Sequence, residues 1–258
     1  MKTMREKRQR GLSLLPNFLT TMSLFCGFYA MISAIKGGFV ISAWAIIAAA
    51  CFDGLDGRVA RLTRTTSKFG VEYDSLSDLV AFGVAPGLLG YIWGLQGFGR
   101  LGWLAAFLYV ATTALRLARF NAISHSGGGS SRYFLGLPCP SAAGIVATAV
   151  LFSQHIGING PVRHMGFLAL VYIVSFLMVS NVRYYSFKEV KWFERHPFSS
   201  LVLLILFLTV IASEPRVTLF ILGIAYGISG PVAIVYRSLF KAKANVRVER
   251  NEEEHHHI

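Results

Sequence analysis

Aspartate is scarce in this sequence, whose 258 residues include only four. All four lie in one stretch, Asp53 to Asp78, which is flanked by strongly apolar runs at 39–52 and 79–93. These runs are compatible with membrane helices, and a carboxylate in hydrocarbon costs on the order of 2.5–3.5 kcal/mol even on the mildest insertion scale. Acidic residues in such a place indicate a function, and four together require cations.

Cysteine is also rare. Cys26, Cys51 and Cys139 lie within or at the edge of apolar segments and form no Cys-x2-Cys pair, so we expect packing residues and no disulfide. No cleavable signal peptide is expected, because the first apolar segment is long and lacks a small-residue cleavage site. The glycine-serine run 125–131 is not a phosphate loop, since neither a Lys-Ser/Thr ending nor a strand accompanies it.

Apolar residues dominate the chain, at 54% of the composition with a mean hydropathy of +0.53. A polytopic membrane protein is the class that fits this composition. Windows of about 20 apolar residues, the length that spans a bilayer, predict an all-α bundle of eight transmembrane helices. The windows are 14–35, 39–60, 71–95, 101–121, 140–155, 164–182, 199–213 and 217–236, of which the fifth and seventh are short.

The distribution of Lys and Arg predicts the orientation. Of the 25 basic residues, 21 lie in one set of alternating connections and only Lys36, Arg100, Arg163 and Arg216 in the other. Basic loops favour the cytosol, so we expect both termini and the aspartate stretch on that side of the cell membrane. The predicted organisation is a basic cytosolic arm at 1–13, a transmembrane domain at 14–237 and a charged, disordered tail at 238–258.

The net charge of +12 does not indicate nucleic-acid binding. The basic residues are spread over five juxtamembrane loops without a groove-reading motif, and attraction to anionic lipid headgroups explains them more simply. The last two apolar windows carry no ionisable residue in their interiors. We expect these helices to serve as scaffold or as a dimer face.

The spacing of the aspartates indicates how they cooperate. Asp53 and Asp56 are three residues apart, and Asp74 and Asp78 four apart, so each pair projects from one face of a helix. The polar segment 61–69 between them is expected to be a short turn, which lets the two pairs face each other. A cluster of carboxylate oxygens suits Mg²⁺ or Mn²⁺ and not zinc. The cluster has room for two ions.

Small and basic residues continue this site. Gly57 and Ala60 lie on the same helix face as the first two aspartates and leave the backbone open to a ligand. Basic side chains at 58, 61, 64 and 68 lie beside it, which suits a phosphate-bearing ligand that bridges metal and guanidinium. We expect a diphosphate.

At these residues the chain resembles the CDP-alcohol phosphatidyltransferases, whose signature it matches at every defined position. The pattern is Asp53-x2-Asp56-Gly57-x2-Ala60-Arg61-x8-Gly70-x3-Asp74-x3-Asp78. The resemblance implies that Asp53, Asp56 and Asp74 hold the metals. It implies that Asp78 completes the second metal site and acts as the base. The residues implied to cradle the CDP group are Gly57, Ala60, Arg61 and Gly70. The family also suggests a homodimer.

Three further residues are candidates. Asn17, in a Pro-Asn-x2-Thr run, either caps the first helix or, by resemblance to the family, lies near the nucleotide. Arg116 and Arg119 are three apart, share a helix face and are expected to bind an anion rather than only to snorkel towards the cytosol. Together with the run 136–140, this region resembles the branch of the family that uses serine as the acceptor.

The predicted reaction is therefore transfer of the phosphatidyl group of CDP-diacylglycerol to L-serine, giving phosphatidylserine and CMP. One alternative is another alcohol acceptor, such as glycerol phosphate or inositol phosphate. A second alternative is a divalent-cation transporter that uses the aspartates as its pathway. Arg58 and Arg61 disfavour the transporter, because they would repel a cation.

Overall fold

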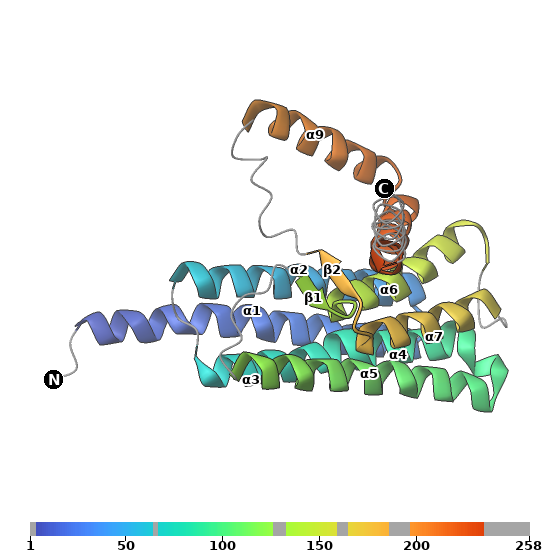
Figure 1. Ribbon diagram of the computed structural model, residues 1–258, viewed down its shortest axis with the longest axis horizontal. Helices are drawn as coiled ribbons and strands as arrows, with labels where there is room; N and C mark the ends of the chain where they lie inside the picture. Colours follow the sequence, from blue (N-terminus) through green and yellow to red (C-terminus); the bar gives the residue numbers. More distant parts are fainter. Residues whose placement is uncertain (1–3, 64–66, 126–132, 159–164, 186–196, 235–258) are drawn as a thin grey trace, which may run out of the picture.

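The protein is a helical bundle in which most helices run side by side along its long axis (Figure 1). The structure is a computed structural model that describes residues 4–63, 67–125, 133–158, 165–185 and 197–234. The helices are α1 (Met4–Ile35), α2 (Phe39–Thr63), α3 (Lys68–Asp78), α4 (Ala85–Gly90), α5 (Arg100–His125), α6 (Cys139–His155), α7 (Met165–Val179), α9 (Pro197–Ser213) and the helix Pro215–Ile234. Between α3 and α5 lie two π-helical segments, η1 (Leu79–Val84) and η2 (Tyr91–Leu95), and the 3₁₀ turn η3 (Gln96–Phe98).

The helical prediction is confirmed, and each of the eight apolar windows falls on a helix. In the part of the chain that the structure describes, five helices are long and apolar enough to cross a membrane, and the protein is a multi-pass membrane protein. Two expectations need correction. Helix α1 begins at Met4, within the segment expected to be a separate arm, so Pro16 and Asn17 lie inside it. The capping role considered for Asn17 is therefore wrong. The tail at 238–258 lies outside the described residues.

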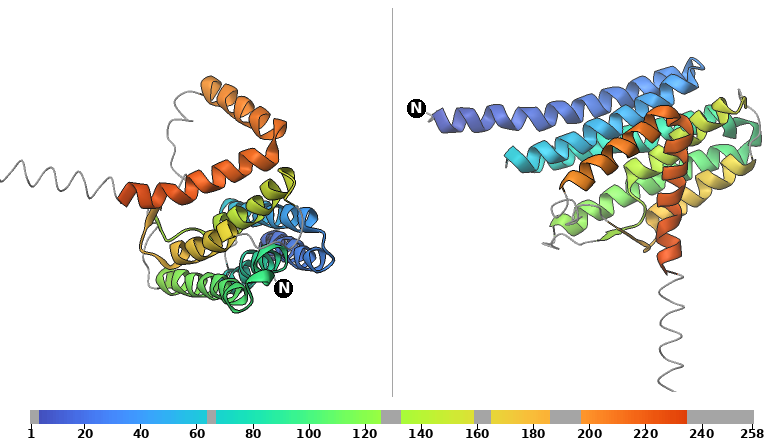
Figure 2. Two further views of the ribbon diagram at one scale, coloured as in Figure 1. Left: turned by 90° about the vertical axis from the view of Figure 1, so that its right-hand side faces the viewer. Right: turned by 90° about the horizontal axis from the view of Figure 1, so that it is seen from above.

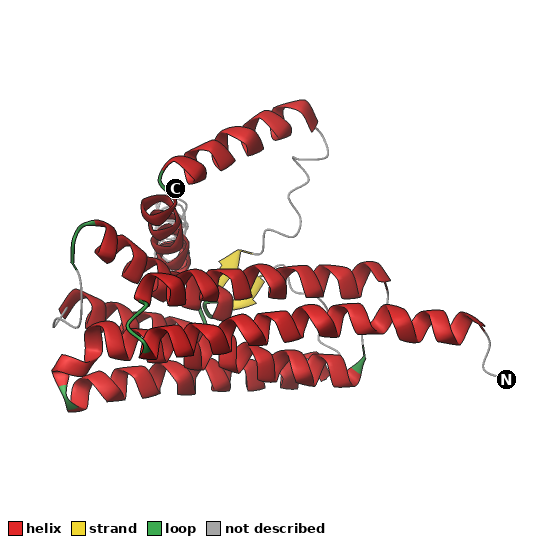
Figure 3. Ribbon diagram, turned by 180° about the vertical axis from the view of Figure 1, so that it is seen from behind, coloured by secondary structure: helices red, strands yellow, loops and turns green. Residues whose placement is uncertain are grey.

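A two-stranded antiparallel sheet was not predicted. Strands β1 (Tyr133–Leu135) and β2 (Arg183–Tyr185) pair with Phe134 opposite Tyr184. Figure 3 shows the strands as one small patch against the helices. The sheet joins the chain segments before α6 and after α7, because Gly136 N donates to Val182 O at 2.8 Å. Gly136 adopts φ +75°, and a Cβ there would collide with the carbonyl oxygen of Met178, so this turn requires glycine.

Small residues allow the helices of the bundle to approach closely. A Cβ on Gly27 of α1 would lie 2.6 Å from Cα of Ala81 in η1, and alanines fill much of the buried core. Hydroxyl groups add hydrogen bonds between helices, such as Ser23 Oγ of α1 to Ala49 O of α2 at 3.1 Å. Close backbone approach and interhelical hydrogen bonds are the interactions that hold membrane helices together, where the hydrophobic effect gives little.

The continuous helical segment 68–98, which α3 begins, departs from α-helical geometry directly after Asp78, where η1 begins. Pro86 contributes to this departure, because it lacks the N–H that would bond the carbonyl of Phe82. The hydroxyl of Tyr109 on α5 donates to that carbonyl instead, at 3.1 Å. This contact satisfies the carbonyl oxygen of Phe82 and joins α5 to the segment 68–98 beside the aspartate stretch.

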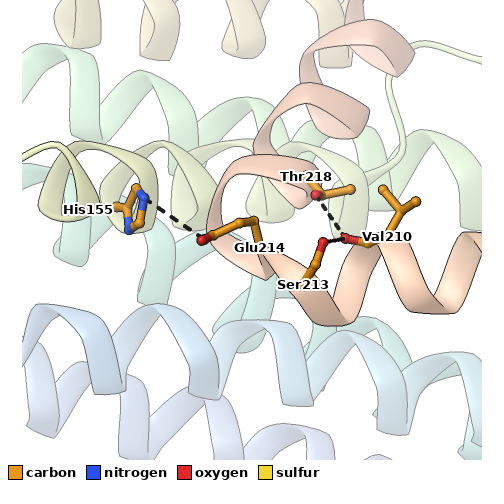
Figure 4. Close-up of polar contacts among 5 residues, drawn as sticks. All are labelled: His155, Val210, Ser213, Glu214 and Thr218. Carbon is orange, nitrogen blue, oxygen red and sulfur yellow. Dashed lines mark hydrogen bonds and ion pairs between the residues drawn. The ribbon is translucent and has the colours of Figure 1, made fainter.

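The last two helices run at an angle to the others, and the second of them, Pro215–Ile234, packs against α6. Figure 2 shows α9 standing off the main bundle and the helix Pro215–Ile234 crossing it steeply. The turn between these two helices is held by Ser213 Oγ and Thr218 Oγ1, which both donate to Val210 O, at 2.8 and 3.4 Å (Figure 4). His155, at the end of α6, lies 3.9 Å from Glu214 across this turn. Both side chains are exposed, so the ion pair adds little stability.

Candidate active site

The four aspartates converge from two helices, with Asp53 and Asp56 on α2 and Asp74 and Asp78 on α3. Asp53, Asp56 and Asp74 each present one carboxylate oxygen, and these oxygens all lie within 4.8 Å of one another. The carboxyl group of Asp78 lies against that of Asp53, beside this triad. The structure thus brings together all four predicted carboxylates, and Asp56 is the least exposed of them, at 5%.

The donor set fits a hard divalent cation. Every donor atom is a carboxylate oxygen, the ligand type that Mg²⁺ and Mn²⁺ prefer. Within the described ranges, no Lys, Arg or His forms an ion pair with any of the four aspartates. Carboxylates this close repel each other strongly in a medium of low dielectric. A bound cation is therefore required for the cluster to be ionised.

Helix α1 supplies a residue that orients Asp56. Thr20 Oγ1 lies 2.7 Å from Oδ2 of Asp56, and Thr20 is buried. Ser77 on α3 donates to the Thr20 carbonyl at 3.1 Å, which ties α1 to the helix that carries the other two aspartates. Sequence reasoning missed the role of Thr20, although it is the threonine of the Pro-Asn-x2-Thr run. Partners of this kind orient metal ligands and tune their affinity.

Thr20→Val should raise the metal concentration needed for half-maximal activity by about 10–100-fold, because Asp56 loses its hydrogen-bond donor. Valine keeps the volume of the threonine side chain. A titration of activity against Mg²⁺ and Mn²⁺ measures this shift. The matched control is Thr21→Val on the exposed side of α1, where Thr21 Oγ1 contacts Asn17 O and Tyr73 OH. An unchanged metal dependence in Thr20→Val would exclude the orienting role.

A pocket of about 170 Å³ opens on one side of the carboxylates. Its lining residues are Pro16, Asn17, Thr20, Asp56, Gly57, Ala60, Ser67, Gly70, Val71 and Asp74. Four of the residues predicted to lie near the nucleotide, Asn17, Gly57, Ala60 and Gly70, are thus gathered around one space. A Cβ on Gly57 would meet no atom of the chain within 4 Å, so packing within the protein does not require glycine there. The α2 backbone at Gly57 is therefore open to a ligand.

Local hydrogen bonds shape the mouth of this pocket. Ser67 caps α3, because its Oγ accepts from Gly70 N at 3.0 Å. A Cβ on Gly70 would lie 3.1 Å from Ser67 Oγ and 3.3 Å from Asn17 Oδ1, so Gly70 keeps this corner narrow but open. The Nε of Arg61 donates to Gly57 O at 2.9 Å, which holds the exposed side chain along α2. Arg61 stands next to the pocket without lining it.

Arg116 lies near Asp53 and Asp78, and neither it nor its neighbour Cys139 lines the pocket. Its Nη1 lies 3.3 Å from Sγ of Cys139, and its Nε is buried without a hydrogen-bond partner. Cys139 is itself buried and within electrostatic reach of Asp78 and Asp53. Arg119 has a different neighbour, because its Nη2 donates to Asn181 Oδ1 at 2.9 Å. The two arginines share α5 but have partners on different parts of the chain.

The carboxylate cluster therefore has two unlike environments: a pocket that Asp56 and Asp74 line, and the half-buried guanidinium of Arg116 near Asp53 and Asp78. This helical fold and aspartate site are those of the CDP-alcohol phosphatidyltransferases. The model of that family matches residues 13–179, and the chain belongs to it. The family uses a divalent metal, in agreement with the carboxylate triad.

The individual relatives point to one branch of the family. The chain is 39% identical over 233 residues to a CDP-diacylglycerol–serine O-phosphatidyltransferase of Helicobacter pylori, covering 89% of this chain and 95% of the relative. It is 37% identical over 157 residues to an enzyme of the same name from Mycobacterium tuberculosis, covering 58% and 54%. It is 33% identical over 183 residues to an archaetidylserine synthase of Methanothermobacter thermautotrophicus, covering 70% and 73%.

Proposed function

We propose that this protein transfers the phosphatidyl group of CDP-diacylglycerol to the hydroxyl of L-serine, giving phosphatidylserine and CMP. The observation that carries the proposal is a carboxylate cluster that has a pocket beside two of its members and a half-buried arginine near the other two. Such an arrangement holds a nucleotide donor on one side and an anionic acceptor on the other. The names of the H. pylori and M. tuberculosis relatives support serine as that acceptor.

The CDP group is assigned to the pocket beside Asp56 and Asp74. Gly57 and Ala60 let the ligand approach the α2 backbone, and Asn17 of α1 contributes an amide to the lining. Arg61 stands at the mouth, where a guanidinium pairs with phosphate oxygens. The acyl chains of the substrate remain in lipid beside the apolar outer faces of the helices.

The carboxylates Asp53, Asp56 and Asp74 would hold the metal, Mg²⁺ or Mn²⁺ in two sites, with Asp78 completing the second. Bound metal neutralises charge on the diphosphate and on the departing CMP. Asp78, at the edge of the triad next to Asp53, takes the proton from the serine hydroxyl. The serine oxygen then bonds to the phosphorus of the phosphatidyl group, and the phosphoanhydride bond to CMP breaks.

Serine is distinguished from most other alcohols by its carboxylate, which needs a fixed cation. Arg116 is a half-buried cation whose Nε lacks a partner, and it lies towards Asp53 and Asp78. Arg119, one turn along α5, adds positive charge nearer the connection after α7. A guanidinium binds a carboxylate through two parallel hydrogen bonds, which gives both affinity and orientation.

The site is further proposed to face the cytosol from the cell membrane, with both chain termini on that side, and the protein is proposed to form a homodimer. The uneven distribution of basic residues supports the orientation. A cytosolic site gives serine access from water. The family resemblance supports the dimer.

Purified protein supplied with CDP-diacylglycerol and Mg²⁺ or Mn²⁺ should release CMP in a serine-dependent manner. Serine should stimulate release more than glycerol phosphate or inositol phosphate does, because only serine places a carboxylate at Arg116. Chromatographic measurement of CMP and of the lipid product, across the three acceptors, tests this expectation. Preference for a phosphorylated alcohol would refute serine as the acceptor and leave the transferase class intact. Metal flux into vesicles without CMP release would support a transporter instead.

A further inference from the structure

The helix Pro215–Ile234 lies outside the part of the chain that matches the family model, and from the sequence we expected scaffold or a dimer face. In the structure it docks closely on the site-bearing bundle. A Cβ on Gly223 would lie 3.2 Å from Cγ1 of Ile145 on α6, and one on Gly227 would lie 3.2 Å from Cδ1 of the same side chain. Glycine at both positions lets the helix backbone rest directly on α6.

The same face of this helix receives Tyr184 of β2. The Tyr184 hydroxyl donates to Gly227 O at 3.0 Å, and a Cβ on Gly230 would lie 2.5 Å from Cζ of the Tyr184 ring. Burial, together with the nearby Tyr226, raises the pKa of Tyr184 to about 12, so its hydroxyl stays protonated and keeps donating. These contacts fix the rotation of the helix about its axis and its position along that axis.

Tyr226 immediately precedes Gly227, and its position follows from this docking. Its ring lies 5.5 Å from the ring of Tyr184, tilted by 41°. Tyr226 is half-buried and within electrostatic reach of Arg116. Between Arg116 and Tyr226 along the chain, the segments before α6 and after α7 are joined by the β1–β2 sheet. Leu137 N also donates to Leu177 O at 3.0 Å. Tyr226 and Arg116, on helices far apart in the chain, thus lie near each other.

Arg116 indicates what binds near these two residues. Its Nη1 contacts only the weakly accepting sulfur of Cys139, its Nε is buried without a partner, and within the described ranges no carboxylate forms an ion pair with it. A guanidinium left in this state is unfavourable unless an anion completes it. Cys139, which Arg116 contacts, is within electrostatic reach of Asp53 and Asp78, so an anion bound at Arg116 belongs to a ligand near the reacting groups.

We propose that Tyr226 is a specificity-determining residue of the acceptor site, where its hydroxyl donates to the carboxylate that Arg116 binds. This inference rests on the proposed function and extends it to a helix beyond the family match. The guanidinium neutralises the carboxylate, and the tyrosine hydroxyl fixes its orientation. The amino acid's own hydroxyl is then directed towards Asp78.

Tyr226→Phe tests the proposal, because it removes one oxygen and keeps the ring that packs on Tyr184. We expect the KM for serine to rise by about ten- to a hundredfold, the range for a lost hydrogen bond to a charged group. The KM for CDP-diacylglycerol should stay near its wild-type value, and a cooperative melting transition should show that the variant is folded. The matched control is Tyr172→Phe on α7, whose hydroxyl donates to Leu101 O on an exposed face.

A double-mutant cycle with Arg116→Lys provides the second measurement. If both side chains bind one carboxylate, their effects on the KM for serine are not additive, whereas independent effects add. Three results would overturn the inference even if the wild type releases CMP in a serine-dependent manner. The first is an unchanged KM for serine in Tyr226→Phe. The others are an equal rise in KM for serine and CDP-diacylglycerol, or strictly additive effects in the cycle. If the wild type does not use serine, the proposed function fails, and this inference fails with it.

Discussion

Replacing Asp53, Asp56 or Asp74 singly with asparagine is expected to abolish turnover. Each of these residues contributes one oxygen to a group that spans no more than 4.8 Å, so each substitution replaces an anionic ligand with a weaker, neutral amide. Metal-ion stabilisation of the transferring phosphoryl group is worth several kcal/mol. A loss of about 4 kcal/mol lowers the rate about a thousandfold. Steady-state CMP release at saturating Mg²⁺ or Mn²⁺ measures the loss.

Glu72→Gln is the matched control for these variants. Glu72 also lies on α3, two residues before Asp74, and its side chain is exposed on a different face from the cluster. It should retain activity. Size-exclusion profiles and melting temperatures should show that all of the variants remain folded. Substantial turnover in any one of the three asparagine variants would remove that residue from the metal site.

Asp78→Asn is expected to lower kcat by about 10²–10⁴-fold, the range for loss of a general base. Asp78 lies next to Asp53 and outside the triad, so three carboxylates remain to hold metal and nucleotide. Binding of CDP-diacylglycerol should therefore survive. Equilibrium binding of the nucleotide lipid, measured alongside turnover, separates the two roles. A loss of binding equal to the loss of turnover would make Asp78 a ligand only.

Local patterns explain why the helices and the carboxylate site were predictable. Hydropathy over about 20 residues reports a spanning segment without knowledge of its neighbours. The spacing of Asp53, Asp56, Asp74 and Asp78 places each pair on one helix face, and a short connection brings the two helices together. The start of α1 at Met4 was missed, since the charged residues before Leu14 carry no membrane signal although they continue the helix.

What the sequence by itself determined was therefore the class of fold, the membrane setting and the metal-binding chemistry of the aspartates. Only the tertiary structure decided how that chemistry is divided into a pocket side and an arginine side. The deciding contacts join residues far apart in the chain, with separations of 36 for Thr20 and Asp56, 23 for Arg116 and Cys139, and 62 for Arg119 and Asn181. Periodicity carries no information at such separations, because helix packing and the β1–β2 pairing set which faces meet. Tyr226 illustrates this most clearly. In the sequence, its apolar helix with three glycines indicates only close packing, whereas in the structure the contact with Tyr184 sets the rotation of the helix and so the position of Tyr226 near Arg116.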